Sequence, residues 1–307
     1  MQEPITVSGV TVAVAAYNAE RNISHLLDAL TGQATDRVPI ERIIIHSDQS
    51  TDRTNPIVQA CGDPRVVLVT SNLRGGFAGA VLNIMRAAPS EVVVILNDDI
   101  RITDPRFIEK AVAPFFREAN VGLVSVNPQP LPPENFVQRG VAAGFRVYEE
   151  MRYAIRNGEN EFTCDGKVLC VSKSFFDRID IPENKADMGN VDAFLYFACR
   201  ALGFHYRHVR DAFVYWKCPA TVSDYVRWTI RNNADRHVLK RRFGDVVERE
   251  YSLPRRAFLR ATLREAVRHP LEIGLMFFLG RYAQFMAQRA SKSLKPAWDV
   301  IGTTKEL

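Results

Sequence analysis

Hydrophobic and polar positions alternate between two periods in the first half of the chain. Short apolar runs rich in Val and Ile indicate buried strands, at residues 11–16, 42–46, 65–70, 91–96 and 121–126. Apolar residues at helical spacing indicate helices between them, at 22–30, from about 51 to 61, at 77–88 and after Asp104-Pro105. Asn22 stands where its side chain would cap the first of these helices. Strands that are apolar almost throughout, separated by helices, predict an α/β fold with a mostly parallel sheet flanked by helices.

The pattern changes after residue 126. A proline-rich loop at 127–135 precedes a predicted helix at 139–156, a short strand at 168–171 and a helix and turn at 190–204. From Thr221 the chain is largely helical and rich in Arg. The sequence therefore predicts two regions, an α/β domain of residues 1–219 and a helical, basic C-terminal region of residues 220–307.

Charge is distributed unevenly along the 307 residues, whose net charge is +5. From Tyr251 onward there are ten Lys and Arg against four Asp and Glu, a net charge of +6. The preceding part is close to neutral, which argues against nucleic acid as a partner of the main body. The C-terminal region is instead expected to meet a local anionic partner.

The first residues lack the basic and apolar segments of a signal peptide, and the five cysteines have no C-x-x-C spacing. Reduced thiols and a cytoplasmic location are therefore expected.

Polar residues follow the predicted strands, where an open α/β sheet binds its ligands. Tyr17-Asn18 follow the first strand, Ser47-Asp48 the second and Asn72 to Gly76 the third, and the fourth ends as "VVVILNDDI". A buried strand that ends in two carboxylates is costly unless a cation meets them. Asp98 and Asp99 are therefore candidate ligands of a hard divalent cation, with a turn or helix cap as the alternative.

Four segments together resemble a known family. "VAVAAYNAERNI", "IIIHSDQSTDRT", "SNLRGGFAGAVLN" and "VVVILNDDI" are similar, in order and spacing, to the successive motifs of family 2 glycosyltransferases with the GT-A fold. They cover roughly residues 10 to 100. A fainter similarity, in "NLRGGFAGA" and "NDDIRI", is to the galactofuranosyl- and rhamnosyl-transferring members.

The resemblance implies a site for a nucleotide-diphosphate sugar, a UDP-sugar first of all, and for Mg²⁺ or Mn²⁺. Asp99 would bind the metal, Asp98 would lie near the ribose or the metal, and Tyr17 would stack against the base. Asp48 would accept a hydrogen bond from the base, and Arg74 and the glycines would lie near the diphosphate and the sugar. The implied donor-binding residues are Tyr17, Asn18, Asp48, Arg74, Gly75, Gly76 and Asp98.

An inverting transferase needs a carboxylate that removes the proton of the acceptor hydroxyl. In the family this acid lies eleven residues before a glycine, which corresponds here to Asp192 and Gly203. Val191, Phe194 and Ala198 depart from the family's E-D-x-D-x-x-x-R pattern, so spacing is the main support. Asp187 competes for the role, and a helix cap is the alternative for Asp192.

Many relatives also place a metal-binding His in the stretch that aligns with residues 211–219, and this chain has none there. Lys217 is the candidate for a fixed positive charge on the diphosphate instead, and an ordinary surface lysine is the alternative.

Residues 256–295 combine Arg-rich helical turns with the apolar patch Leu271–Leu279. That patch is too short to span a bilayer. A basic amphipathic helix on the anionic inner face of a membrane is the first interpretation, and a helical lid or dimer surface is the second.

The predicted function is that of an inverting glycosyltransferase that moves a sugar to a hydroxyl of a glycan or lipid-linked acceptor. The alternatives are a sugar nucleotidyltransferase and an inactive sugar-nucleotide-binding scaffold. A nucleotidyltransferase would normally carry a glycine-rich basic loop after its first strand, where this chain has "AAYNAERN". A dinucleotide-binding fold is disfavoured because "RGGFAGA" lacks G-x-G-x-x-G spacing.

Overall fold

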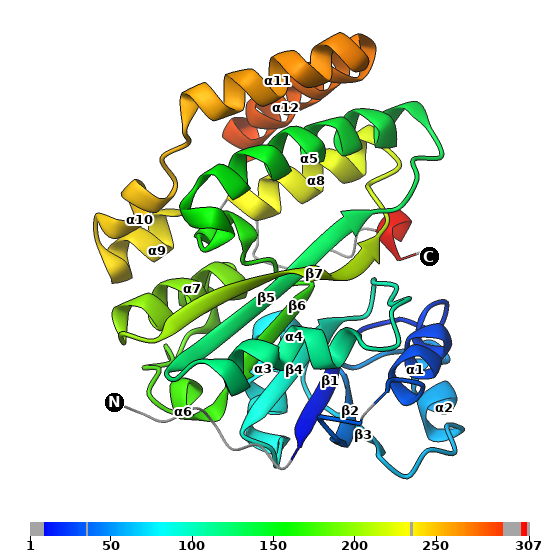
Figure 1. Cartoon of the computed structure of the whole chain (residues 1–307). Helices are drawn as coiled ribbons and strands as arrows, with labels where there is room; N and C mark the ends of the chain where they lie inside the picture. Colours follow the sequence, from blue (N-terminus) through cyan, green and yellow to red (C-terminus); the bar gives the residue numbers. More distant parts are fainter. Residues whose placement is uncertain (1–8, 35, 234–235, 291–301, 306–307) are drawn as a thin grey trace.

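The computed structural model describes residues 9–34, 36–233, 236–290 and 302–305, and its central element is one seven-stranded sheet (Figure 1). The strand order is β3-β2-β1-β4-β6-β5-β7. All neighbouring strands are parallel except β6, which is antiparallel to β4 and β5. The strands are β1 (Val10–Ala16), β2 (Ile40–Ser47), β3 (Val66–Thr70), β4 (Val92–Asn97), β5 (Val121–Pro130), β6 (Val168–Ser172) and β7 (His205–Trp216). The predicted α/β class with a mostly parallel sheet is confirmed.

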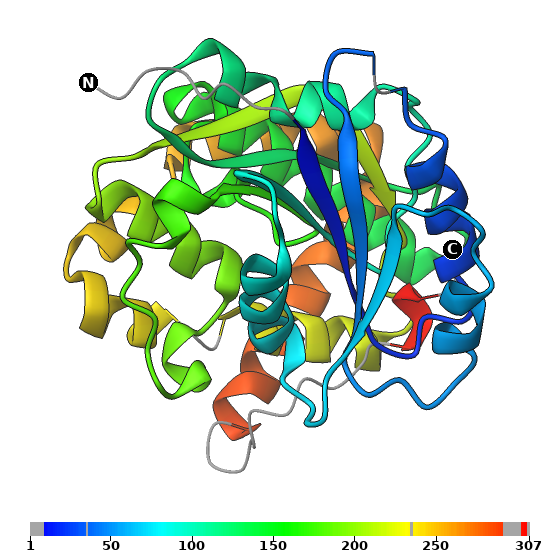
Figure 2. The ribbon, with the colours of Figure 1, turned by 90° about the horizontal axis from the view of Figure 1, so that it is seen from below.

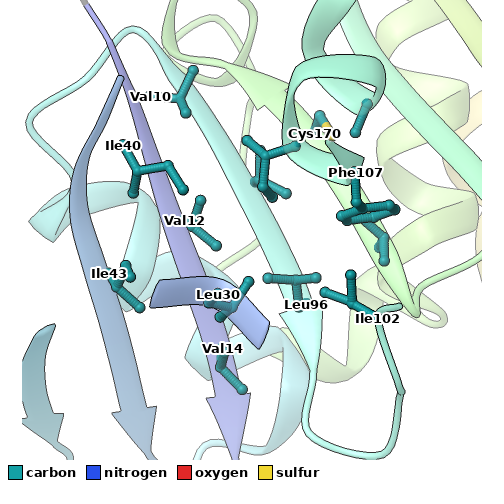
Figure 3. Packing of buried hydrophobic residues seen from close by; sticks show 14 of the residues in the cluster. Val10, Val12, Val14, Leu30, Ile40, Ile43, Leu96, Ile102, Phe107 and Cys170 are labelled. Atoms are coloured by element: carbon teal, nitrogen blue, oxygen red, sulfur yellow. The ribbon is translucent and has the colours of Figure 1, made fainter. Parts of the chain in front are cut away.

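Helices cover both faces of this sheet because side chains of the strands alternate between two apolar layers. One layer packs under α1 (Ile23–Thr31), α2 (Thr54–Gln59) and α4 (Phe107–Arg117). Figure 3 shows Val10, Val12 and Val14 of β1 in this layer, beside Leu30 of α1. The opposite layer packs under α3 (Gly76–Ala87), α6 (Lys173–Phe176), α7 (Val191–Ala201) and α9 (Arg236–Phe243).

A further helical layer lies beyond β5 and β7 (Figure 1). It consists of α5 (Phe136–Ala154), α8 (Val222–Asn233), α11 (Arg255–Arg268) and α12 (Pro270–Ala290). The glycines of α5 let α12 approach closely, since a Cβ at Gly140 would lie 2.9 Å from Leu275 and one at Gly144 would lie 3.0 Å from Met276. Helix α5 precedes residue 219, whereas α8, α11 and α12 follow it, and all four belong to this layer. The predicted division at residue 219 therefore separates helices that pack together. The remaining elements are α10 (Val246–Glu250) and short 3₁₀ turns, the last of which is η4 (Gly302–Thr304).

Two local predictions differ from the structure. The first concerns Asn22, which does not cap α1 with its side chain; its Nδ2 donates instead to the carbonyl of Lys305, at 2.7 Å. The second concerns the late strands, since β5 extends into the predicted proline-rich loop as far as Pro130, and β7, where no strand was predicted, is twelve residues long. Proline is tolerated at the end of β5 because a strand end needs fewer ladder hydrogen bonds.

Candidate active site

A cavity of about 870 Å³ lies where the carboxyl ends of the parallel strands face the helical layer. It brings together most of the residues singled out in the sequence. Seven of them line it: Tyr17, Asp48, Arg74, Gly76, Asp98, Asp99 and Asp192. Because these residues come from four separate strand ends and from the start of α7, the sheet topology is what collects them.

Asp98 and Asp99 follow β4 directly, as predicted. Asp98 is 6% exposed, and its Oδ2 accepts hydrogen bonds from the amide of Tyr17 and the ammonium of Lys305, both at 2.8 Å. The buried carboxylate is therefore compensated by an ammonium that no sequence pattern predicts at this position.

The acid pair fits a hard divalent cation bound jointly with a ligand. Among the described residues, no cluster of three or more His, Cys, Asp or Glu side chains could hold a metal ion alone. Mg²⁺ and similar ions commonly use one or two carboxylates and take their other ligands from water and substrate phosphates. Asp98 and Asp99 would supply the protein's share of such a site.

Asp48 holds the glycine loop in place. Its Oδ1 accepts from Gly75 N at 2.8 Å and Ser71 Oγ at 2.9 Å, and its Oδ2 accepts from Gly76 N at 2.8 Å. Gly76 has a φ of +62°, which favours glycine, so the loop can turn both amides toward the carboxylate. A carboxylate accepts about four hydrogen bonds, which leaves Asp48 capacity for one N–H from a base. Gly75, by contrast, does not line the cavity.

Tyr17 lines the cavity, and the guanidinium of Arg74 lies over its ring, 3.9 Å from the ring centroid. A base that stacks on this face of Tyr17 must displace Arg74 or insert beside it. Asn18 lies outside the lining and has a structural role, because its Oδ1 accepts from Thr51 N at 2.8 Å and thereby joins two strand-end loops.

Asp192 lies in the cavity wall at the start of α7. Its Oδ2 accepts from Gly166 N and its Oδ1 from Ala193 N, each at 2.9 Å. Burial, assisted by the charge of nearby Asp165, raises the pKa of Asp192 to about 6. A carboxylate with such a pKa is ionised at neutral pH and is a stronger base than an exposed aspartate.

Two sequence candidates lie elsewhere. Asp187 is exposed, 4.0 Å from Arg241, and does not line the cavity. Lys217 also lies outside the lining, and its ammonium pairs with Glu134 at 2.9 Å. A lysine held by a carboxylate outside the cavity is not placed to meet a diphosphate, so Lys217 is not part of the site proposed below.

The residues that precede β6 also belong to the site, although no sequence motif pointed to them. Asp165, Gly166 and Lys167 line the cavity, and the amide of Asn97 donates to the carbonyl of Lys167 at 3.0 Å. Glu161 lies further along the same wall and accepts from the hydroxyl of Tyr251 at 2.8 Å. Burial raises the pKa of Glu161 to about 8.

The far side of the cavity is apolar and is formed by the helical layer. Aromatic and aliphatic side chains line it: Phe145, Tyr148, Tyr225, Trp228, Phe258, Met276 and Leu279. Tyr225 and Trp228 belong to "DYVRW" on α8, whose Trp228 stacks on Trp216 with ring centroids 6.2 Å apart. One cavity therefore joins an acidic, polar end at the sheet to an apolar end at the helices.

A mostly parallel sheet that collects an acid pair, an aromatic ring and a glycine loop at its strand ends defines the GT-A class of glycosyltransferases. The sequence model of glycosyltransferase like family 2 matches residues 8–233, and the chain belongs to this family of enzymes. The resemblance found in the sequence is thereby confirmed. No curated protein matches the sequence.

Solved structures with a similar fold include a mannosyltransferase from Pyrobaculum calidifontis in complex with GDP-mannose and Mn²⁺. It is 20% identical, with 96% of this chain and 83% of that chain covered and a TM-score of 0.57. Glucosyl-3-phosphoglycerate synthase from Mycobacterium tuberculosis, in complex with Mn²⁺, UDP and glucosyl-3-phosphoglycerate, is 15% identical, with 77% and 80% covered and a TM-score of 0.55. At these identities the similarity establishes the GT-A fold.

Proposed function

We propose that the protein transfers a sugar, with inversion, from a nucleotide-diphosphate donor to a hydroxyl of a lipid-linked glycan acceptor. The observation that carries the proposal is that the acid pair Asp98 and Asp99 and the carboxylate of Asp192 line one cavity. The two parts have different chemistry, since a metal-binding pair suits a diphosphate and a single carboxylate of raised pKa suits a general base.

The donor subsite lies at the strand ends. Asp99 and Asp98 would hold Mg²⁺ or Mn²⁺, which when bound would neutralise the diphosphate as it leaves. Asp48 has capacity to accept an N–H of the base, and Tyr17 offers its ring. The Mn²⁺ complexes of both similar structures are consistent with this assignment, and a UDP-sugar remains the first donor to test.

Asp192 is the proposed base. The hydrogen bonds from Gly166 N and Ala193 N fix its carboxylate in the cavity wall. In that position it would take the proton of the acceptor hydroxyl as the oxygen attacks the anomeric carbon from the face opposite the diphosphate. A single displacement of this kind inverts the configuration at that carbon.

The apolar end of the cavity supports a lipid-linked acceptor. Phe258, Met276 and Leu279, from α11 and α12, meet the cavity from the inner side of the helical layer. A free sugar would leave this wall without a partner, whereas an acceptor with an apolar portion would bury it.

The outer side of α11 and α12 supports binding to an anionic membrane surface. Its exposed apolar side chains are Leu259, Leu263, Val267, Leu271, Phe277, Phe278, Tyr282 and Phe285. Exposed arginines lie among them, and two of these, Arg260 and Arg264, pair with Glu150 of α5 and tie α11 to the domain. No helix in the described ranges is long and apolar enough to cross a membrane. A basic, amphipathic face that lies on the surface fits this combination.

We expect the protein to sediment with vesicles of anionic phospholipid at low salt and to dissociate at about 0.5 M salt, because such attraction is screened. The double variant Leu263→Glu, Phe278→Glu should weaken this binding at least about tenfold, since each change places a charge where apolar burial is expected. Leu202→Glu, at an exposed leucine of the α/β domain, is the control. Two results would contradict this proposal. One is equal vesicle binding by wild type and double variant, and the other is a wild-type dimer that becomes a monomer in the double variant, which would make this face a dimer surface.

The function itself is tested with a panel of UDP- and GDP-sugars, lipid-linked acceptors and Mn²⁺. A transferase releases the nucleoside diphosphate only as the glycosylated product appears, and that product has the anomeric configuration opposite to that of the donor. A nucleotidyltransferase would instead release pyrophosphate when it is given a nucleoside triphosphate and a sugar 1-phosphate, and a scaffold would bind the donor without turnover. Either of these last results would refute the proposal.

A further inference from the structure

The segment Gly302–Lys305 lies beside the ends of β1 and β4, although Lys305 is 207 residues from Asp98 in sequence. Figures 1 and 2 show η4, drawn in red, between the α1 and α2 side of the domain and α8. Thr304 and Lys305 both line the active-site cavity. No motif in the sequence pointed to this segment.

Hydrogen bonds to both sides of the cavity fix the segment. Thr303 Oγ1 donates to Asp224 Oδ2 of α8 at 2.7 Å and accepts from Ala220 N at 3.2 Å. On the opposite side, the carbonyl of Lys305 accepts from Asn22 Nδ2 at 2.7 Å. Thr304, between them, is 8% exposed. The segment therefore bridges the first loop of the α/β domain and the first turn of α8.

These anchors place the ammonium of Lys305 among the strand-end residues. It donates to Asp98 Oδ2 at 2.8 Å and to the carbonyl of Tyr17, so that it joins the ends of β4 and β1. The side chain of Lys305 is 19% exposed and that of Asp98 is 8% exposed. An ion pair this well enclosed requires its geometry to be maintained, because either charge alone would be costly at this depth.

The segment forms a wall of the cavity and does not fill it. The volume of about 870 Å³ is present with Thr304 and Lys305 in place. The hydrogen bonds that Asp98 accepts from Tyr17 N and from Lys305 Nζ both go to Oδ2. Lys305 thus engages one oxygen of Asp98, and a ligand can enter without removing the segment.

Other cations of the donor side have different partners. Lys167 pairs with Asp165 at 3.2 Å and lies over the ring of Trp216, and Arg74 lies over the ring of Tyr17. Lys305 directly contacts Asp98, one member of the acid pair proposed to hold the metal. Lys305 has the position that was predicted for the charge of Lys217.

We propose that Thr303–Lys305 is part of the donor subsite and that Lys305 binds the nucleoside diphosphate of the donor. This inference rests on the proposed function, which places the diphosphate beside Asp98 and Asp99. A lysine ammonium is a compact charge suited to phosphate oxygens. In the absence of nucleotide, this ammonium weakens the attraction of the acid pair for a divalent cation. When the diphosphate is present, the anion contacts both cations, so metal and nucleotide bind better together than separately.

The test measures binding of UDP and of GDP, each with Mn²⁺, by calorimetry with the full chain. Lys305→Met should raise the Kd of the nucleotide that wild type prefers by about tenfold or more, since a charged hydrogen-bonding partner is lost. Lys305→Arg keeps the charge and should lose less. Binding of Mn²⁺ alone should be as tight in Lys305→Met as in wild type, or tighter. The matched control is Lys110→Met, which removes an ammonium paired with Asp104 at 2.7 Å outside the cavity.

Thr303→Val provides a second variant, because it removes the hydrogen bond to Asp224 and leaves Lys305 intact. It should also weaken nucleotide binding, by less than Lys305→Met, and it decides the question if Lys305→Met does not fold. Unchanged or tighter nucleotide binding by the folded Lys305 variants would overturn the inference and leave the proposed function standing. If wild type binds neither nucleotide with Mn²⁺, the donor subsite itself is refuted, and this inference falls with it.

Discussion

Replacing Asp192 by asparagine is expected to lower turnover at least about a hundredfold while donor affinity changes little. A positioned general base contributes about 10²- to 10⁴-fold, or roughly 3 to 5 kcal/mol of the barrier. Asparagine has nearly the same shape and cannot take a proton. Because Tyr17, Asp48 and the acid pair hold the donor in this proposal, the loss should fall on kcat and not on the Kd of the nucleotide.

Folding must be measured separately for this variant. Both oxygens of Asp192 accept backbone N–H groups, and asparagine offers only one oxygen. Its amide group would then face an N–H donor, which costs about 1 to 3 kcal/mol of stability. Thermal unfolding and nucleotide binding therefore accompany the kinetic assay. Asp187→Asn is the control, since Asp187 is exposed and lies outside the cavity. If Asp187→Asn abolishes turnover and Asp192→Asn does not, the base has been assigned to the wrong acid.

The pH dependence of turnover is an independent test of Asp192 as the base. The base acts as the carboxylate, so turnover should fall as pH drops through about 6, the pKa to which burial and Asp165 raise Asp192. Above that pH the acid limb should reach a plateau. Lys167 acts against this shift and favours the ionised form. In Asp192→Asn the remaining activity should not show this fall near pH 6. If the fall is retained with the same midpoint, the titrating group is not Asp192.

The strand ends could be predicted because their signal is local. Each parallel strand is apolar almost throughout, and the polar residues after it must reach the carboxyl edge of the sheet. Tyr17, Asp48 and the Asp98–Asp99 pair were found in this way and lie together in the cavity. Asp192 came from the family resemblance, and its place in the cavity wall is consistent with that assignment.

What the sequence did not reveal depended on strand direction and on long-range packing. β6 is antiparallel to β4, with Val168 opposite Leu96, so residues that precede β6 lie at the same edge as residues that follow β4. Inspection of the residues after each strand could not find Asp165 and Lys167. A search before any strand of reversed direction would have found them. Lys305 gives no such signal, because it reaches Asp98 only through the contacts of its segment, which joins Asn22 through Lys305 and α8 through Thr303.

Replacing Asp99 by asparagine is expected to abolish the Mn²⁺-dependent part of nucleotide binding and to lower activity about a thousandfold or more. Asp99 follows the strand end directly and lines the cavity, and the proposal assigns it a direct bond to the metal. An asparagine keeps one neutral oxygen and loses the charge that a hard divalent cation prefers. Stabilisation of a leaving diphosphate by such a cation amounts to several kcal/mol, and about 4 kcal/mol corresponds to about a thousandfold in rate.

Calorimetry of UDP and GDP with Mn²⁺ and with EDTA separates the metal's contribution from that of the protein. In wild type, EDTA should weaken nucleotide binding strongly, and in Asp99→Asn the affinities with and without Mn²⁺ should nearly coincide. Asp28→Asn, at an exposed carboxylate of α1 outside the cavity, should behave as wild type. A wild type that is indifferent to EDTA would mean that the positive charge for the diphosphate comes from the protein alone, with Lys305 as its nearest source. Equal Mn²⁺ dependence in wild type and Asp99→Asn would instead move the metal to other ligands.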